Sequence, residues 1–247
     1  MFHPNGPSLK ELIKQALSST KEGYDQLAPK FDYTPFLTPK QLVDQVVKYL
    51  TEDADSKPIN THEFNSTIDL CTGTGAGVEG LIPIVSNEIV GVDWSEPMLA
   101  EAKKKFAGVT KPRIRFVCEN IFKINYPEKF DLVTCFGALG HIEKSRQKEF
   151  VDLIYRLLKP GGRFAFVTAD KPKWYQPSAW PYFIFDAVMK VRNWAIKPEF
   201  VMYYINFLLP DALRLFRISD WTITLVAPLE INGRSTSAKL VVVQKDI

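Results

Sequence analysis

The chain has 247 residues, of which 46% are hydrophobic, with 31 Lys and Arg against 28 Asp and Glu. This composition fits one globular domain, and a net charge of +3 is too small to indicate nucleic-acid binding by itself. The sequence predicts no transmembrane helix, because it has no apolar run long enough, and its start lacks the pattern of a signal peptide. Three cysteines without metal-binding spacing favour a reducing, cytoplasmic environment and no metal site.

The first part of the chain is expected to be helical around an aromatic segment. Residues 9–17 have helical spacing, which Ser18–Thr20 and Gly23 are predicted to break, and residues 24–37 are interpreted as a linker. Thr38 is a suitable N-cap and Pro39 a suitable first residue for a helix that runs to about Leu50. Residues 53–65 are polar and are predicted to form a loop.

Strands and helices alternate through the middle of the chain. Apolar runs at about 66–71, 88–92, 114–118, 130–135 and 162–169 predict buried strands, and helical patterns lie at roughly 76–83, 96–106 and 144–158. The sequence KPGG at 159–162 is predicted to end the third of these helices. Such alternation indicates right-handed βαβ crossovers and a doubly wound parallel sheet.

The last third has a different composition. Residues 174–207 contain eleven aromatic side chains, and the apolar stretches at 180–194 and 200–209 are interpreted as two packed helices. Residues 221–225 and 239–244 predict two more strands. A turn around Asn232 and Gly233 between them favours an antiparallel pair.

A nucleoside pocket is predicted from the stretch STIDLCTGTGAG at 66–77. A strand ends near Asp69 and is followed by Gly73, Gly75 and Gly77, which let the backbone turn tightly and approach a ligand closely. The next strand ends at Asp93, whose carboxylate can accept hydrogen bonds from two ribose hydroxyls. Both features are expected at the carboxyl edge of the sheet.

The identity of the bound nucleoside is harder to predict, because Gly75–Gly80 also matches the GxGxxG pattern of dinucleotide-binding proteins. That pattern requires its first glycine directly after the strand, whereas Gly75 follows Leu70 by five positions. Asp69 would also lie where two phosphates are expected, and a ligand with an ammonium group suits this acid better. An NAD(P)-dependent oxidoreductase therefore stays as an alternative.

Five stretches resemble, in the right order, the motifs of the class I S-adenosylmethionine (SAM)-dependent methyltransferases. They are IDLCTGTG at 68–75, VGVDWSEPMLA at 90–100, FVCENI at 116–121, FDLVTCFGALGHI at 130–142 and LLKPGGRFAF at 157–166. The resemblance implies a Rossmann-like, doubly wound, seven-stranded sheet that is mostly parallel with an antiparallel last strand. It also implies methyl transfer from SAM, with S-adenosylhomocysteine (SAH) as product. Cys71 departs from the first motif, where the family has a glycine.

The resemblance also assigns cofactor-binding roles. Asp69, Cys71, Gly73 and Gly75 belong to the first motif, and Asp93 is the acid that binds the ribose. The remaining residues implied at the cofactor are Trp94 and Met98 beside the adenine, Asn120 at its amine, Ile121 on its ring and Phe136 nearby. The structural alternatives are that the apolar residues of this set belong to the hydrophobic core and that Asn120 is a turn residue.

An amino-terminal segment, YDQLAPKFDY at 24–33, resembles one that closes over the cofactor in many small-molecule members of the family. It implies that Tyr24 or Tyr33 reaches the methionine part of SAM, although both tyrosines could simply pack. His141 follows the fourth predicted strand and titrates in a useful range, so it is the candidate general base. A structural hydrogen-bonding role is the alternative for His141.

We therefore expect one domain over 1–247, in which 1–60 form a helical lid and 61–170 the SAM-binding core. Residues 171–210 are expected to form a helical substrate lid, and 211–247 the last helix and the strand pair. The apolar lid suggests a small, apolar or aromatic acceptor, and the loop at 135–138 disfavours nucleobase amine methylation. A non-catalytic SAM-binding or partner-binding module is a further alternative. The same lid helices could also contact a membrane surface.

Overall fold

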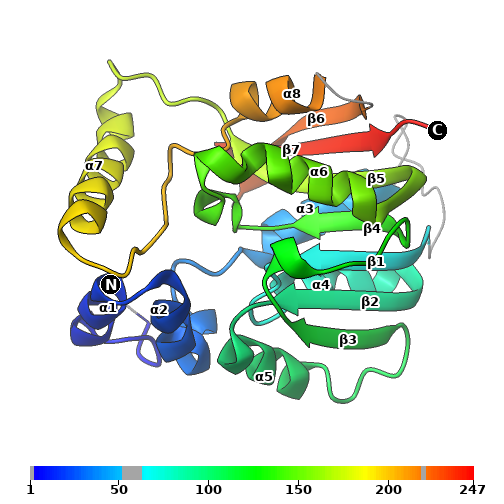
Figure 1. The fold of residues 1–247 in the computed structure, drawn as a ribbon, viewed down its shortest axis with the longest axis horizontal. Helices are drawn as coiled ribbons and strands as arrows, with labels where there is room; N and C mark the ends of the chain where they lie inside the picture. Colours follow the sequence, from blue (N-terminus) through cyan, green and yellow to red (C-terminus); the bar gives the residue numbers. More distant parts are fainter. Residues whose placement is uncertain (1–2, 52–62, 218–220) are drawn as a thin grey trace.

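The structure, a computed structural model, describes residues 3–51, 63–217 and 221–247, and within them seven strands form one sheet (Figure 1). The strand order is β3-β2-β1-β4-β5-β7-β6. All neighbours are parallel except that β7 runs antiparallel to both β5 and β6. The strands are β1 (Phe64–Leu70), β2 (Val85–Asp93), β3 (Arg113–Cys118), β4 (Phe130–Cys135), β5 (Leu158–Ala169), β6 (Trp221–Ile231) and β7 (Arg234–Lys245). The predicted doubly wound, seven-stranded sheet is confirmed.

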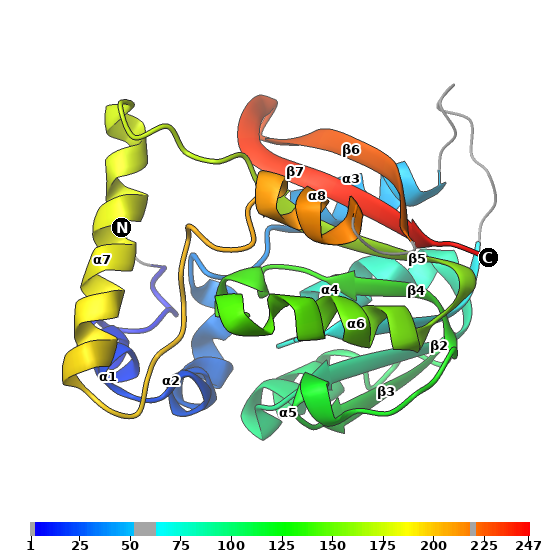
Figure 2. The same ribbon diagram turned by 45° about the horizontal axis from the view of Figure 1, so that its top comes forward.

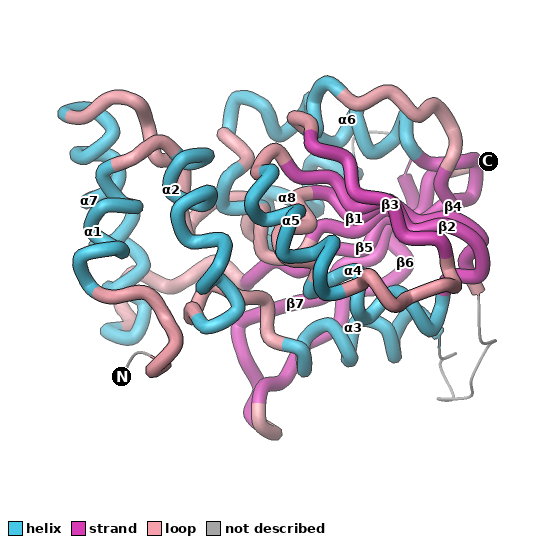
Figure 3. Tube along the Cα trace, turned by 90° about the horizontal axis from the view of Figure 1, so that it is seen from below, coloured by secondary structure: helices cyan, strands magenta, loops and turns pink. Residues whose placement is uncertain are grey.

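Helices cover both faces of this sheet. The α-helices of the described residues are α1 (Leu9–Leu17), α2 (Thr20–Leu27), α3 (Lys40–Thr51), α4 (Ala76–Leu81), α5 (Glu96–Lys105), α6 (Gln147–Leu157), α7 (Trp180–Ala195) and α8 (Leu209–Arg217), of which α1, α2 and α7 lie beyond the end of the sheet. Figure 3 shows α3 and α6 on opposite sides of the sheet. Each side has its own apolar core: Val46 and Leu81 are fully buried on the α3 side, and Phe150 and Phe216 on the α6 side. Burying each such side chain contributes about 1.5–3 kcal/mol, so both layers hold the sheet in place.

The amino-terminal segment contains one helix more than the sequence pattern predicts. Ser18 is the C-cap of α1, and Ser19 is the N-cap of α2. Ser19 and Glu22 form a capping box, in which each side chain accepts the backbone N–H of the other. The interpretation of 24–37 as a linker is therefore wrong over its first part, since Tyr24 lies in α2 and residues 28–33 form a 3₁₀ helix. Gly23 does not break the helix. A Cβ there would lie 2.7 Å from the ring of Phe200, so this glycine permits close packing.

The first residues of α3 and β5 also differ from the sequence prediction. Helix α3 starts at Lys40 rather than at Pro39, and the carbonyl of Pro39 accepts the N–H groups of Leu42 and Val43. The KPGG sequence lies in the irregular start of β5 rather than before it, and Gly161 adopts a φ of +74° there. Residues 52–62, most of the predicted polar loop, lie outside the described residues, and residues 64 and 65 belong to β1.

The aromatic insertion contains one long helix, not two. Within the fully described stretch 174–207, α7 and a 3₁₀ turn at 177–179 are the helices, and the chain after Ala195 is irregular. Side chains of α7 form hydrogen bonds with backbone groups of the irregular chain after Ala195. The Asp186 carboxylate accepts the N–H groups of Tyr204 and Ile205, and Asn193 bonds both backbone groups of Phe200. These groups consequently need no helix of their own to be satisfied.

The elements outside the sheet layers gather at one end of the molecule. Helices α1, α2 and α7 stand beyond the end of the sheet at which the parallel strands finish (Figures 1 and 2). Hydrogen bonds join them, since the Arg192 guanidinium on α7 donates to the carbonyls of Ala16 and Ser18 at the end of α1. This arrangement places the amino-terminal helices over the edge where the predicted site residues lie.

Candidate active site

A cavity of about 210 Å³ lies at the carboxyl ends of β1, β2 and β4, beneath α2. It brings together most of the residues that the sequence singles out. The predicted residues that line it are Tyr24, Asp69, Cys71, Gly73, Asp93, Trp94, Met98, Asn120, Ile121, Phe136 and His141. The site is therefore assembled from five segments that are distant in sequence.

Two predicted residues do not line the cavity. Gly75 has a φ of +86° and precedes α4, where an added Cβ would lie 2.5 Å from the ring of Phe106, so its absence of a side chain serves the turn. Tyr33 is 43% exposed and stacks on His3 with ring centroids 4.8 Å apart. Its ring does not reach the cavity, and only Tyr24 of the two tyrosines does so.

Gly77, the third glycine of the predicted loop, also lines the cavity, and a Cβ there would meet both the Asp69 carboxylate and the Phe136 ring at 2.8 Å. Other lining residues were missed by the sequence interpretation. They include Thr20, Phe31, Phe36, Leu37, Thr38, Thr72, Thr74, Ile142, Arg146 and Val201. Thr72 and Thr74 fall inside the quoted glycine loop and could have been found there. Phe31 and Ile142 also fall inside quoted stretches, at 24–33 and 130–142. Arg146 directly precedes α6, and the others come from the amino-terminal segment and the insertion, where no motif marks them.

Asp93 is held rigidly at the end of β2. One carboxylate oxygen accepts the N–H of Gly73 at 2.9 Å, and the other accepts the N–H of Ser95 at 2.9 Å. Burial raises the pKa of this carboxyl, whereas the backbone N–H bonds lower it. Ser95 caps α5, because its hydroxyl accepts the N–H of Met98 at the start of that helix. The glycine loop and the acid thus fix each other at the cavity wall.

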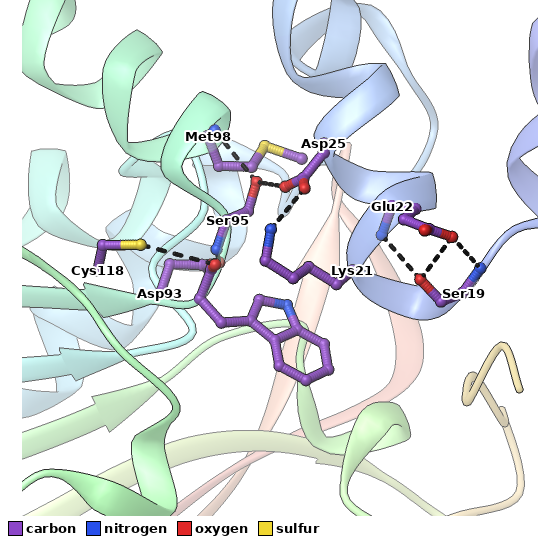
Figure 4. Close-up of polar contacts among 9 residues, drawn as sticks. Ser19, Lys21, Glu22, Asp25, Asp93, Ser95, Met98 and Cys118 are labelled. Carbon is purple, nitrogen blue, oxygen red and sulfur yellow. Dashed lines mark hydrogen bonds and ion pairs between the residues drawn. The ribbon is translucent and has the colours of Figure 1, made fainter. Parts of the chain in front are cut away.

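Helix α2 contacts this same corner through polar groups (Figure 4). The Ser95 hydroxyl donates to the Asp25 carboxylate at 2.5 Å, and Lys21 pairs with the other oxygen of Asp25 at 2.6 Å. Further along, the Thr74 hydroxyl of the glycine loop donates to Asp32 at 2.5 Å. The amino-terminal segment is therefore hydrogen-bonded to the loop and to α5 across the cavity.

Asp69 lies beneath the glycine loop with almost no exposure. Its two oxygens accept the hydroxyls of Thr72 and Thr134, both at 2.6 Å. Burial raises the pKa of the Asp69 carboxyl from 3.8 to about 6, against the lowering effect of those two hydroxyls. The carboxylate supports the loop and adds negative potential below the cavity.

Asp69 makes stability depend on pH in a defined direction. Because its pKa is higher in the folded state, its contribution is complete below pH 3.8 and is lost as pH rises through about 6, a change of about 3 kcal/mol. We expect the unfolding free energy of the wild type, relative to Asp69→Asn, to fall by up to that amount over this range. Urea titrations at a series of pH values measure the difference. A difference that stays constant with pH would contradict the assignment.

Cys71 occupies an unusual backbone position. Its φ is +56°, in the left-handed region, where a residue with a Cβ costs roughly 1–2 kcal/mol more than glycine. The hydrogen bond with Cys135 and burial raise the pKa of the Cys71 thiol, so it is protonated. The glycine-to-cysteine departure is thus tolerated by packing against a second buried thiol.

The residues expected around an adenine differ in exposure. Met98 and Ile121 are buried, whereas Trp94 is 40% exposed at the cavity rim. The Asn120 side-chain oxygen accepts the N–H of Phe122 at 3.0 Å, which orients the amide at the start of a 3₁₀ turn. Both readings of Asn120, the turn residue and the ligand contact, are thereby compatible with its geometry.

His141 and Tyr24 form a partly buried, hydrogen-bonded pair in the cavity wall. The carbonyl of Val201 lies 2.5 Å from His141 Nδ1, so Nδ1 carries the proton and donates it. Nε2 is then the acceptor for the Tyr24 hydroxyl at 3.0 Å. Burial lowers the pKa of His141 and raises that of Tyr24, so both side chains are neutral near pH 7. The pair presents one imidazole lone pair that can accept a proton.

Neither a metal nor a membrane span is indicated. The described part of the chain holds no cluster of three or more His, Cys, Asp or Glu side chains arranged to bind a metal ion. None of the helices in that part is long and apolar enough to cross a membrane.

Sequence comparison identifies the central part of the chain. Residues 67–162 match the methyltransferase domain family. The demethylmenaquinone methyltransferase of Oceanobacillus iheyensis is 26% identical over 150 residues, which cover 60% of this chain and 62% of that protein. The corresponding enzyme of Lactococcus lactis is 34% identical over 112 residues, 43% of each chain. The chain thus spans less than two thirds of the length of these curated relatives.

Solved structures show the same fold. The N-methyltransferase NodS from Bradyrhizobium japonicum, in complex with SAH, superposes with a TM-score of 0.62 at 15% identity, covering 92% of this chain and 99% of that one. The magnesium protoporphyrin IX methyltransferase from Synechocystis, with bound SAH, gives a TM-score of 0.60 at 17% identity over 84% and 83% of the two chains. Residues 67–162 thus match the methyltransferase domain family, and the seven-stranded sheet has the fold of these solved methyltransferases.

Proposed function

We propose that this protein transfers a methyl group from SAM to a small apolar or aromatic acceptor and releases SAH. The observation that carries the proposal is the cavity at the carboxyl ends of β1 and β2, where Asp93 and the glycine loop are hydrogen-bonded to each other. This is the position at which an open α/β sheet binds a nucleoside. The names of the relatives, which are all methyltransferases, support SAM rather than a dinucleotide.

The residues would hold SAM as follows. Asp93 accepts the two ribose hydroxyls, Trp94, Met98 and Ile121 enclose the adenine, and the side-chain amide of Asn120 bonds its polar edge. The glycine loop at 71–77 approaches the methionine part, while Asp69 offsets the positive charge of the sulfonium and ammonium groups. When bound, SAM supplies an electrophilic methyl group, and the protein has to align it with the acceptor.

The acceptor would lie between the glycine loop and the lid. Phe31, Phe36, Leu37, Ile142 and Val201 give this side of the cavity an apolar wall. Such a wall binds an apolar or aromatic ring by excluding water. Several relatives are named demethylmenaquinone methyltransferases, which is consistent with an aromatic acceptor that carries an apolar chain.

The reaction is an in-line displacement that breaks one bond and forms one bond. A lone pair of the acceptor attacks the methyl carbon, the carbon–sulfur bond breaks, and its electron pair stays on sulfur, which becomes neutral. If the acceptor is methylated on a hydroxyl or amine group, that group has to lose a proton. His141 lines the cavity, and the lone pair of its Nε2 could accept this proton. The Tyr24 hydroxyl would rotate away from Nε2 as the acceptor enters.

The division of the chain follows from the same scheme. Residues 61–170 would form the SAM-binding core and residues 1–60 a lid that touches it through Asp25 and Asp32. Residues 171–210 would cover the acceptor, since Val201 and Phe200 lie against the partly buried pair of Tyr24 and His141. Residues 211–247 complete the sheet. The mild net charge gives no support to a nucleic-acid substrate, and the cytoplasmic location stays a prediction.

Calorimetry with SAH and with NAD(P) tests the cofactor. We expect SAH to bind with a micromolar dissociation constant or better and NAD(P) to show no heat; binding of NAD(P) alone would favour an oxidoreductase. Mass spectrometry of an acceptor library of hydroxylated aromatics, lipid quinols, peptides and RNA then tests the reaction. Methylation of an apolar small molecule is expected. Binding of SAH without turnover on any of them would favour a non-catalytic module.

A further inference from the structure

Helix α7 carries an apolar face that points away from the protein. Five of its residues lie on one side, at spacings of three or four, and are each more than half exposed: Trp180, Ile184, Val188, Val191 and Trp194. We call this set the outer face of α7. Scattered exposed apolar residues are normal, but a continuous stripe over a whole helix marks an interaction site.

The outer face exists because the helix is anchored through its other side. Met189 packs inward, and Asp186, Arg192 and Asn193 are all buried and hydrogen-bonded. Arg192 alone donates to carbonyls of Ala16, Ser18 and Pro198. The buried polar side fixes the rotation of α7, so the apolar side cannot turn into the protein. Figures 1 and 2 show α7 at the margin of the molecule.

Helix α1, which Arg192 joins to α7, repeats the pattern. Leu9, Ile13 and Leu17 lie four residues apart and are each more than half exposed. Its inward residue is the buried Gln15, on the opposite side of the helix. Two neighbouring helices therefore both expose apolar side chains where a surface helix normally presents polar ones.

Among the described residues, the exposed charges without an ion-pair partner on α1, on α7 and directly before α7 are all lysines. The exposed lysines are Lys10 and Lys14 on α1, Lys171 and Lys173 before α7, and Lys190 on α7. The acidic side chains of the same segments form ion pairs or hydrogen bonds within the protein. Glu11 pairs with Lys30 and Glu199 with Lys197, while the Asp186 carboxylate is buried on backbone N–H groups. An apolar stripe with flanking lysines is complementary to a negatively charged, partly apolar surface.

We propose that the outer face of α7, together with the exposed side of α1, docks on an anionic lipid membrane. A helix of 16 residues, about 24 Å long, can lie in the interface, and the tryptophans at its two ends suit the boundary between headgroups and acyl chains. The lysines would contact anionic headgroups. A second copy of the chain fits less well, because a two-fold contact through this face would bring Lys190 of each copy close to that of the other.

Docking at this place would put the cavity close to the lipid. The chain leaves α7 at Ile196 and reaches the cavity within a few residues, where Phe200 stacks on Tyr24 and Val201 bonds His141. An apolar acceptor dissolved in the membrane would then have a short path to the apolar wall. The docking itself does not depend on the proposed reaction, and it can be tested without SAM or acceptor.

Flotation with lipid vesicles tests the proposal. The purified full-length protein is mixed with vesicles of phosphatidylcholine alone or of phosphatidylcholine with phosphatidylglycerol. We expect it to float with the mixed vesicles and to partition into them at least about tenfold better than into the neutral ones, with a loss of binding at high salt. Val191→Asp should reduce this partitioning by about tenfold or more, because it puts a charge in the centre of the outer face.

The matched control is Val226→Asp, an exposed valine on β6 outside these helices, which should float like the wild type. Circular dichroism and thermal unfolding show whether each variant is folded. If Val191→Asp unfolds, Lys190→Glu with Lys173→Glu provides the second test, and weaker flotation is expected. No flotation of the wild type, or equal flotation of the valine variants, would overturn the proposal. So would a wild-type dimer in sedimentation that Val191→Asp converts to a monomer without any lipid binding.

Discussion

Replacing Asp93 by Asn is expected to weaken SAH binding by about 100-fold. The carboxylate can accept a hydrogen bond from each ribose hydroxyl, and a bond to a charged group is worth about 1.5–3 kcal/mol. The amide keeps the size of the side chain but loses the charge and one acceptor, and a loss of about 3 kcal/mol corresponds to the factor given. Isothermal titration calorimetry with SAH measures the change directly and needs no knowledge of the acceptor.

The design has to separate ribose binding from loop geometry, since Asp93 also holds the N–H groups of Gly73 and Ser95. Glu96→Gln is the matched control: this acid lies three residues along and pairs with Lys103 at 2.9 Å on the exposed side of α5. It should bind SAH like the wild type. Thermal unfolding of both variants shows whether the loop has been disturbed. An Asp93→Asn protein that is folded and binds SAH normally would contradict the proposed ribose site.

The order of the strands and the position of the site could be predicted because both depend on local signals. Apolar runs bounded by turns define the strands, and parallel strands bring their carboxyl ends to one edge, so Asp69 and Asp93 had to lie near each other. The cap of α5 at Ser95 and the turn at Asn232 and Gly233 are likewise local. Residues of this kind need no knowledge of the remainder of the chain.

What could not be predicted depends on contacts between distant segments. Gly23 looks like a helix breaker in sequence, and only its packing against Phe200 explains why it lies within α2. The stretch 200–207 is apolar enough for a helix, but Asp186 and Asn193 of α7 bind its backbone. Tyr33 belongs to a motif and nevertheless faces His3, whereas its partner Tyr24 reaches the cavity. In each case tertiary contacts override a local pattern.

His141→Gln is expected to lower kcat by about 100- to 10,000-fold with an acceptor that has to lose a proton. Burial lowers the pKa of His141 from 6.5, so the wild-type imidazole is a competent base at neutral pH. The wild-type kcat/KM should therefore rise with pH through a value below 6.5 and then become level, and this acid limb should disappear in the variant. The pH profiles of kcat and kcat/KM, measured with the acceptor that the library identifies, check both expectations.

Tyr24→Phe distinguishes a base from a structural histidine. It removes the hydroxyl that donates to His141 Nε2, a bond that favours neutral imidazole, and leaves a ring to stack on Phe200. If His141 accepts the proton, this variant should keep kcat within about tenfold. The acid limb of its kcat/KM profile, which reports the free enzyme in which Tyr24 bonds Nε2, should move to higher pH. If His141 only secures the carbonyl of Val201, the limb would be the same in the wild type, Tyr24→Phe and His141→Gln. Equal SAH affinity in all three proteins would show that the effects arise after cofactor binding, at the step in which the acceptor loses its proton.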